Sequence, residues 1–435
     1  MQHMLHSCLP LKSTEPGGPP SRGRFLNRTV LGAGVTSALG DFCYETTTVI
    51  LPGFLAVLGI PAAFLGFIEG VADALASFTK MAAGYIADKL GHRKTLVIVG
   101  YALTPVGQVL IALAAGWPLI LAGRMVSWFG KGMRGPLRDA IVSQAISPET
   151  RGRAFGFHRA MDTVGAVFGP LLGVALLGWA QHLPWPDAAG PFRLVFWLTL
   201  IPGILAALAF LFLVKDPEHS PNPALKFFST VRGLPTRFKR YLRAVALFGM
   251  GDFSHSLLIL AATQWLTPSF GVVKAAQIAG LFYVGRNIVQ VVASYPVGVL
   301  ADRFGSQRVL VGGYALGILT AGLTAAAFIL PTIPFTLIGG VFLLAGLYMA
   351  VQEALEATVT AELVSADVRA MSYGVLGSVN GAAKFVSSTS VGFLWTAVSP
   401  GFGFGLATLL MLVGTVFLAR LRQNKSQATN NQSNS

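Results

Sequence analysis

The sequence predicts an all-α membrane protein with twelve transmembrane helices in two pseudo-symmetric six-helix bundles, on the basis of its composition, its apolar runs and an internal repeat. Of its 435 residues, 53% are hydrophobic and only 11% are charged, and the mean hydropathy is +0.64. A soluble domain carries about 25% charged residues, so this chain has too little polar surface to cover a water-soluble globule. Because a span needs roughly 20 apolar residues, the chain has room for about a dozen spans and no separate soluble domain.

The apolar runs divide the chain into five parts. A polar N-terminal tail (1–28) precedes a first bundle (29–214), and a basic linker (215–243) leads into a second bundle (244–420). The Asn-, Ser- and Gln-rich tail 421–435 is expected to be disordered. The predicted spans cover residues 29–58, 62–86, 95–115, 118–141, 154–179, 193–214, 244–266, 276–300, 308–330, 334–360, 371–397 and 401–420.

Basic residues are distributed very unevenly between the two sides of these spans. Of the 32 Lys and Arg residues, 22 fall in tails and loops on one side, and only Arg193 and Lys274 lie in loops on the other. Short basic loops stay on the cytoplasmic side. We therefore expect a multi-pass protein of the inner (plasma) membrane with both termini in the cytoplasm. Topology explains the net charge of +14, so nucleic-acid binding is not expected.

The two predicted bundles share sequence landmarks in the same order. The matched pairs are Gly40–Phe42 with Gly251–Phe253, Gly84–Lys94 with Gly298–Arg308, and Ser147–Gly156 with Ser365–Gly374, at offsets of 211, 214 and 218 residues. Each member of the second pair is followed by an apolar run that contains Gly-Tyr-Ala-Leu. Two like halves with parallel topology place a substrate path at their interface, near the middle of the membrane.

The loop after the second span carries a family signature. Gly84–Lys94 has the pattern G-x-x-x-D-K-x-G-x-R-K, which resembles the loop between spans two and three of the major facilitator superfamily. The resemblance extends over about residues 29–420 and implies that family's fold and secondary transport, without naming a substrate. A plain positively charged loop is the alternative, but it would not need an Asp and two glycines at fixed spacing. The residues that the resemblance assigns to gating are Gly84, Asp88, Lys89, Gly91, Arg93 and Lys94, with Asp302 in the second half.

Spans four and five carry further glycine patterns. Gly165–Gly173 resembles the G-x-x-x-G-P-x-x-G pattern of the superfamily's antiporters, and ordinary small-residue packing is the alternative. In span four, Arg124 is not followed by Gln and Gly within a turn, so the family's proton-transfer role is not carried over to it. The G-x-G-x-x-G at Gly130–Gly135 lies inside a span and follows no strand, which excludes a dinucleotide site. We expect no enzymatic activity, cofactor or metal.

Ionisable residues inside the spans are the candidate functional groups, because a charge at bilayer depth is costly unless it is paired or hydrated. In span one, Asp41 and Glu45 lie one helical turn apart, and two such carboxylates in a poorly solvated site resist joint ionisation. We predict that the coupling proton is carried by this group of acids, with Asp41 or Asp73 preferred. The alternative is that they permanently neutralise basic groups such as Lys131. The full set of candidates is Asp41, Glu45, Glu69, Asp73 and Asp162, the last favoured equally for a structural role.

Depth sorts the remaining polar groups. Those expected to contact the substrate are Arg124, Lys131, Asp252, Tyr283, Arg286, Asn287 and Lys384. Those near the cytoplasmic helix ends, expected to form gate salt bridges, are Arg134, Arg138, Asp139, Glu149, Arg151 and Glu356. The repeat matches Asp73 with Asn287 and Asp162 with Asn380, so proton handling is predicted mainly in residues 29–180. Acids and bases nearly balance near the midplane, so neither a cationic nor an anionic substrate is excluded.

These features predict a secondary transporter that exports a small molecule in exchange for protons. The sequence has no ATP-binding motif, so an ion gradient must supply the energy. A proton-coupled uptake symporter is one alternative. A non-transporting sensor or scaffold on the same fold is another, and it should tolerate neutral replacements at Asp41 and Asp73. The predicted partners are a small solute, protons and the lipid bilayer, and the protein is expected to be a monomer.

Overall fold

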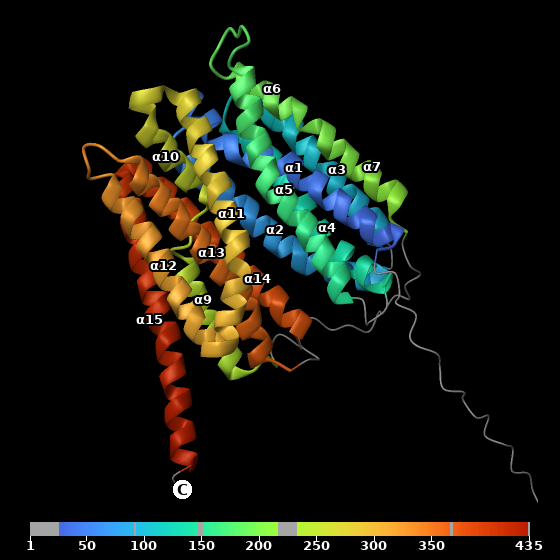
Figure 1. Ribbon diagram of the computed structural model, residues 1–435, viewed down its shortest axis with the longest axis vertical. Coiled ribbons are helices and arrows are strands. Elements are labelled where there is room, and N and C mark those ends of the chain that lie inside the picture. Colours follow the sequence, from blue (N-terminus) through green and yellow to red (C-terminus); the bar gives the residue numbers. More distant parts are fainter. Residues whose placement is uncertain (1–25, 91–92, 147–150, 216–232, 366–368, 434–435) are drawn as a thin grey trace, which may run out of the picture.

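A computed structural model describes residues 26–90, 93–146, 151–215, 233–365 and 369–433. Every regular element within these ranges is an α-helix, and the helices run side by side in one bundle (Figure 1). Each of the twelve predicted spans coincides with one helix or with a pair of consecutive helices. Apolar composition was therefore sufficient to locate the helices.

The first half contains one interrupted span. Its helices are α1 (Arg28–Val57), α2 (Ala62–Leu90), α3 (Arg93–Ala112), α4 (Trp117–Gln144), α5 (Arg151–Ala180), α6 (Gly190–Leu198) and α7 (Leu200–Leu213). The helix α1 begins where the Asn27 side chain accepts a hydrogen bond of 2.9 Å from the Val30 N–H, a standard N-cap. The predicted sixth span is split into α6 and α7 at Thr199. Pro202 explains the interruption, because it has no N–H to continue the helical ladder.

The second half differs from the predicted boundaries at two places. Its helices are α9 (Thr236–Gly249), α10 (His255–Phe270), α11 (Val272–Phe304), α12 (Ser306–Ala327), α13 (Phe335–Leu363), α14 (Arg369–Ala397) and α15 (Pro400–Ser433). Helix α9 begins inside the segment predicted as linker, because Phe238 and Tyr241 bury an apolar face (0% and 2% exposed). Helix α15 continues into the segment predicted as a disordered tail, since extending an existing helix costs far less than nucleating one.

The predicted seventh span is broken at residues 250–254, between α9 and α10. Gly251 lies against α15 so closely that a Cβ would overlap the Ala407 carbonyl oxygen, which only glycine permits. The Ser254 hydroxyl then accepts from the Ser256 N–H at the start of α10. The break places Asp252 on a non-helical segment inside the bundle. Irregular backbone at this depth is tolerated where protein surrounds it or where it lines a cavity.

The two halves use the same packing scheme. In the first half, α3 packs on α4, α2 on α4, α1 on α5, and α7 on both α1 and α3. In the second half, the equivalent pairs are α12 with α13, α11 with α13, α9 with α14, and α15 with both α9 and α12. The sequence repeat thus corresponds to a repeat of helix contacts.

One end of the bundle can be defined by the first helix. The Arg28 guanidinium donates to the Phe212 carbonyl oxygen at 2.8 Å, and the Asn27 amide donates to the Ala145 carbonyl oxygen at 2.7 Å. The start of α1 and the ends of α4 and α7 therefore meet at one end, which we call the linker face. The opposite end, which carries the connection 181–189, is called the loop face.

The two halves meet mainly along α2 with α14 and α5 with α11, and α1 also contacts α10 and α11. Helices α2 and α14 are in contact along most of their length, from Gly66 against Gly392 to Met81 against Gly374. Helix α5 contacts α11 where Ala166 lies against Asn287 and where Val174 and Gly178 lie against Gln277. These segments lie toward the loop face, so α5 and α11 are in contact at that end of the molecule.

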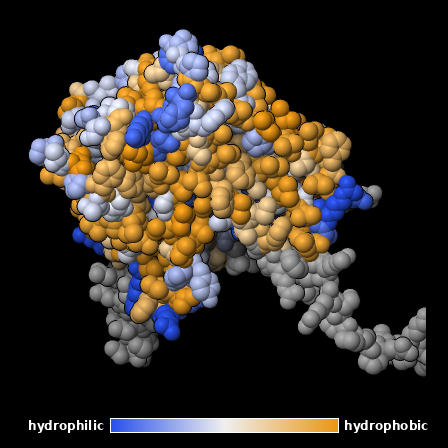
Figure 2. All heavy atoms as spheres, turned by 45° about the horizontal axis from the view of Figure 1, so that its top comes forward, coloured by the Kyte–Doolittle hydropathy of each residue, from blue (hydrophilic) through white to orange (hydrophobic). Residues whose placement is uncertain are grey.

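The outer surface suits a lipid environment. Within the described residues, seven stretches are long and apolar enough to cross a membrane, judged by length and composition alone. They are Ala62–Ala83, Arg93–Ala112, Phe157–Ala180, Gly190–Leu213, Ser306–Ala327, Phe335–Leu363 and Pro400–Leu421. Helix α4 is not among them, since its inner side carries four basic residues. Figure 2 shows apolar residues over most of the visible surface and hydrophilic residues in a few separate patches.

Candidate substrate-binding and coupling site

A closed ion pair occupies the core of the first half. The Arg124 Nη2 atom donates to both carboxylate oxygens of Glu69, at 2.6 and 2.7 Å, and the two side chains are 0% and 1% exposed. The Arg124 Nη1 atom donates to the Thr48 hydroxyl at 3.2 Å, and the guanidinium lies 3.6 Å from the Trp128 ring centroid. Glu69 was predicted to carry protons and Arg124 to contact substrate. Their mutual burial favours a structural role for both.

A second group of charges near the centre remains open. The Lys131 Nζ atom lies 3.9 Å from the Tyr44 ring centroid and 5.1 Å from that of Trp128. Among the described residues, no carboxylate oxygen lies within 4.0 Å of Lys131. Asp41 and Glu45, one turn apart on α1, are likewise half-buried and form no salt bridge within the described ranges. These three groups can therefore change partners without breaking an existing ion pair.

Glu45 connects the two halves. The Tyr283 hydroxyl on α11 donates to its Oε2 atom at 3.2 Å. One turn further along α11, the Asn287 amide donates to the Ala166 carbonyl oxygen on α5 at 2.8 Å. Asn287, predicted to contact substrate, thus forms part of the contact between halves. The titratable carboxylate of Glu45 lies in the same contact between the two halves.

The glycines of α5 hold the α1 acids against that helix. A Cβ at Gly165 would overlap Asp41, and one at Gly169 would press on Glu45. The Thr46 hydroxyl also donates to the Gly169 carbonyl oxygen at 2.8 Å. Both acids therefore lie on the side of α1 that packs against the G-x-x-x-G-P-x-x-G segment. The pattern positions the candidate coupling residues as well as packing two helices together.

The other two predicted proton carriers occupy different surroundings. The Trp128 indole N–H donates to Asp73 Oδ1 at 3.0 Å, and Asp73 is half-buried on α2. Asp162 accepts from the Ser37 hydroxyl and lies 3.9, 3.6 and 3.5 Å from basic nitrogens on three side chains. Those three residues are Arg138, His158 and Arg159. Asp162 thus belongs to an interhelix salt-bridge cluster, whereas Asp73 faces one neutral donor.

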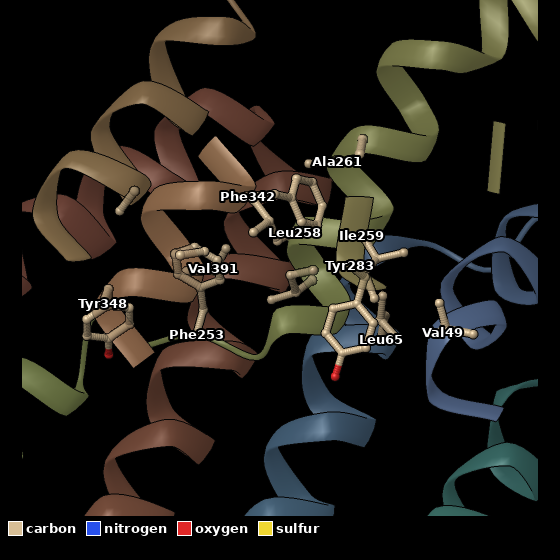
Figure 3. Packing of buried hydrophobic residues seen from close by; sticks show 14 of the residues in the cluster. Val49, Leu65, Phe253, Leu258, Ile259, Ala261, Tyr283, Phe342, Tyr348 and Val391 are labelled. Carbon is tan, nitrogen blue, oxygen red and sulfur yellow. The ribbon is translucent and has the colours of Figure 1, made fainter. Parts of the chain in front are cut away.

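A small cavity lies inside the second half. Four of the seven predicted substrate-contacting residues line it, and His255 stacks on one of them, with ring centroids 5.0 Å apart. The Lys384 Nζ atom lies 4.0 Å from Asp252 Oδ2. Figure 3 shows Phe253, Tyr283, Phe342 and Tyr348 gathered around this region. The four predicted residues are Asp252, Tyr283, Arg286 and Lys384.

Polar partners fix the position of Arg286 at the cavity wall. Its Nη1 atom donates to Asn287 Oδ1 at 2.8 Å and to Gln290 Oε1 at 2.7 Å. The Gln290 amide in turn donates to Glu353 at 2.6 Å. Arg286 is 7% exposed and these partners are mostly neutral, so its charge is available to an anionic group in the cavity.

The predicted gate residues differ in burial and in their partners. Arg134 donates to the Thr104 hydroxyl at 2.8 Å, and Arg138 donates to Tyr101 at 3.2 Å and pairs with Asp139 at 3.2 Å. Arg93 is buried, Lys94 is half-buried and Asp302 is exposed. Glu356 lies in a buried cluster of the second half. Gly91 and Glu149 lie outside the described residues. Gly84, Asp88, Lys89 and Arg151 lie in helices, but the surroundings of these four residues are not described.

The arrangement of two similar helical halves around central charges agrees with comparisons to known proteins. The family model for the Major Facilitator Superfamily matches this chain twice, over residues 31–267 and 244–435. The chain belongs to the Major Facilitator Superfamily. It is therefore a transmembrane transporter rather than an enzyme, which confirms the predicted family and fold.

Individual relatives in this superfamily agree. An uncharacterized MFS-type transporter of Methanocaldococcus jannaschii is 28% identical over 91% of this chain and 95% of its own length. An uncharacterized MFS-type transporter of Bacillus subtilis is 24% identical over 87% and 90%. Among solved structures, a mutant form of the nucleoside transporter NupG matches with a TM-score of 0.74 at 14% identity, over 91% of this chain and all of that one. A bacterial homolog of the human lysosomal transporter Spinster, inward-facing and occupied, matches with 0.70 at 17%, over 91% and 96%.

Sequence reasoning missed part of this superfamily site. His255 and Tyr348 line the cavity, yet neither was assigned a role, because one buried aromatic or histidine is not distinctive in an apolar span. The interruption of span seven was also missed. The signal for it was present, since Gly249 and Gly251 lie two residues apart immediately before Asp252.

Proposed function

We propose that the chain is a proton-coupled antiporter, which exports a small solute by alternating access between its two halves. The observation that carries this proposal is the hydrogen bond from Tyr283 to Glu45, because it joins the halves through a titratable group. When Glu45 is ionised it accepts this bond and attracts Lys131. When it is protonated both attractions weaken. The protonation state of Glu45 therefore biases the contact between the halves.

The proposed proton-coupling group contains fewer acids than the five that the sequence suggested. Of the five candidate acids, Glu69 is sealed by Arg124 and Asp162 is held by basic side chains. The unpaired α1 carboxylates lie beside Lys131, and Asp73 contacts only the Trp128 indole among hydrogen-bond donors in the described ranges. We assign proton transfer to Asp41 and Glu45, with Asp73 as the third member. Their packing against the α5 glycines supports exchange, since that glycine pattern resembles the one in antiporters.

We propose the cavity of the second half as the substrate site. It offers two cationic groups, Arg286 and Lys384, one carboxylate, Asp252, and an aromatic wall that includes the stacked His255 and Tyr283. A pocket that combines apolar walls with a few convergent polar groups is the usual form of a small-molecule site. Tyr283 belongs to this wall and also donates to Glu45. Substrate and proton sites are thus linked through one side chain.

The distribution of basic residues sets the proposed orientation. Arg28 and the exposed arginines of α9 lie at the linker face, and short basic segments remain on the cytoplasmic side. We therefore place the linker face and both termini in the cytoplasm, and the protein in the inner membrane. In this orientation the α5–α11 contact closes the outward side, and the halves separate there when substrate is released.

Transport in everted membrane vesicles tests the proposal. A compound that stabilises the purified protein in a thermal-shift screen should accumulate in vesicles acidified inside. Glu45→Gln should abolish this accumulation, whereas Glu362→Gln, a carboxylate bonded to Ser306 and remote from the cavity, should not. A symporter would load substrate only when the gradient is reversed. Accumulation in the Glu45→Gln variant at the wild-type rate would contradict the assignment.

A further inference from the structure

The second half contains a buried carboxylate whose hydrogen-bond donors among the described residues are all neutral. Glu356 on α13 is 4% exposed. Its Oε1 atom accepts hydrogen bonds from the Tyr314 hydroxyl at 2.7 Å and the Gln352 amide at 3.2 Å, and its Oε2 atom accepts from the Asn380 amide at 2.5 Å. All three donors are neutral. Among the described residues, no Lys, Arg or His nitrogen lies within 4.0 Å of this carboxylate.

The equivalent position in the first half holds an ion pair. The repeat matches Tyr101 with Tyr314, Arg138 with Glu356, and Asp162 with Asn380. In the first half, Arg138 donates to the Tyr101 hydroxyl at 3.2 Å and lies 3.9 Å from Asp162. In the second half, Tyr314 and Asn380 both contact Glu356. Glu356 thus stands where the first half has Arg138, and Asn380 stands where it has Asp162. The first site is neutral by pairing, whereas the second is neutral only when Glu356 carries a proton.

The surrounding charges do not supply the missing cation. Lys384 lies beside Asp252, and Arg286 is bonded to Asn287 and Gln290. The titratable and charged groups on the elements around Glu356 are Tyr241 on α9, Asp252 between α9 and α10, Arg286 on α11, Tyr314 on α12, Tyr348 and Glu353 on α13, and Lys384 on α14.

Gln352 connects Glu356 to the cavity. Its amide nitrogen donates to Glu356 Oε1 at 3.2 Å and to Asp252 Oδ2 at 3.3 Å. Asp252 lines the cavity and pairs with Lys384. A ligand that engages either member of that pair alters the charge next to Gln352, and through this short path the electrostatic potential at Glu356.

We propose that Glu356 is a second proton-binding site, which exchanges a proton with solvent as the Asp252–Lys384 pair gains and loses its ligand. An uncompensated buried charge is strongly disfavoured, whereas a neutral hydrogen-bonded acid is not. The protonated acid keeps its partners, because the Tyr314 hydroxyl can accept as well as donate and Asn380 can still donate. This inference rests on the proposed proton coupling, and it adds a site in the half where sequence reasoning expected little proton handling.

Glu356→Gln is a close mimic of the protonated acid, so it separates the two possible states of this group. We would record difference infrared spectra between acidic and alkaline pH on the purified protein in lipid vesicles. The wild type should show a carbonyl-stretch band of a protonated carboxylic acid that Glu356→Gln lacks and Glu362→Gln keeps. The melting temperature of Glu356→Gln should match that of the control. A retained band, or a clearly lower melting temperature for Glu356→Gln, would overturn the proposal.

Two further variants keep this result separate from the proposed function. Lys384→Met should move the pH at which the Glu356 band appears, because it removes the charge that Asp252 now pairs with. An unmoved band would refute the link through Gln352. Vesicle transport by Glu45→Gln reports on the α1 acids alone. If that variant transports normally while Glu356→Gln lacks its band, coupling through α1 fails and the Glu356 site stands. The opposite pair of results rejects Glu356 and leaves the proposed function intact.

Discussion

Breaking the buried pair between Glu69 and Arg124 should destabilise the first half strongly. Both side chains are at most 1% exposed, and two hydrogen bonds of 2.6 and 2.7 Å join them. Removing one partner from such a pair typically costs about 3–5 kcal/mol, because the other charge stays buried without compensation. We expect Glu69→Leu and Arg124→Met each to lower the free energy of unfolding by about that amount. The double variant should recover most of the loss, since apolar replacements of a whole buried pair are often neutral.

The assay is reversible unfolding in mixed micelles, followed by helix content as the denaturing detergent increases. The double-mutant cycle gives the coupling energy between the two sites. The double variant should also retain ligand binding, because the pair does not line the cavity of the second half. Single-variant losses below about 1 kcal/mol would place the pair among solvent-exposed salt bridges and refute its role as a sealed core element. Loss of ligand binding in a folded double variant would instead restore Arg124 to the substrate site.

Three further results are expected. Gly66→Val should destabilise the fold by about 1–3 kcal/mol by overpacking, measured by thermal unfolding, because a Cβ there would overlap the Ser388 carbonyl oxygen; an unchanged melting temperature would contradict the α2–α14 contact. Alanine at Arg286 should weaken ligand binding by about 2–5 kcal/mol in titration calorimetry, and an unchanged affinity would remove Arg286 from the site. Asp88→Asn should abolish transport yet preserve affinity, and a parallel fall in both would argue against gating.

The sequence was sufficient for the fold because membrane spans are defined by composition. Lipid accepts long apolar helices and rejects exposed backbone, so the apolar runs together with the repeat indicate where the helices lie. The break in the seventh span follows from a tertiary contact and was not predicted. Gly251 is required because α15 approaches it closely, and the sequence of α9 alone does not reveal that approach.

The sequence was least informative about which side chains each buried acid contacts. The sequence grouped Glu69 and Asp73 as candidate proton carriers, but it could not show that Arg124 pairs with Glu69 and that Asp73 lies beside an indole. Depth alone assigned Glu356 to a gate. The structure buries it among neutral donors. The repeat aligns Glu356 with Arg138, so an acid occupies the position that a cation occupies in the first half.

Proton release on ligand binding tests the central claim most directly. The purified protein, in weakly buffered solution with a pH-sensitive dye, is mixed with a compound selected by thermal shift. An antiporter that uses the α1 acids should release protons as the compound binds. The Asp41→Asn/Glu45→Gln double variant should bind the compound with little release. Proton uptake, or release undiminished in the double variant, would contradict exchange through these carboxylates.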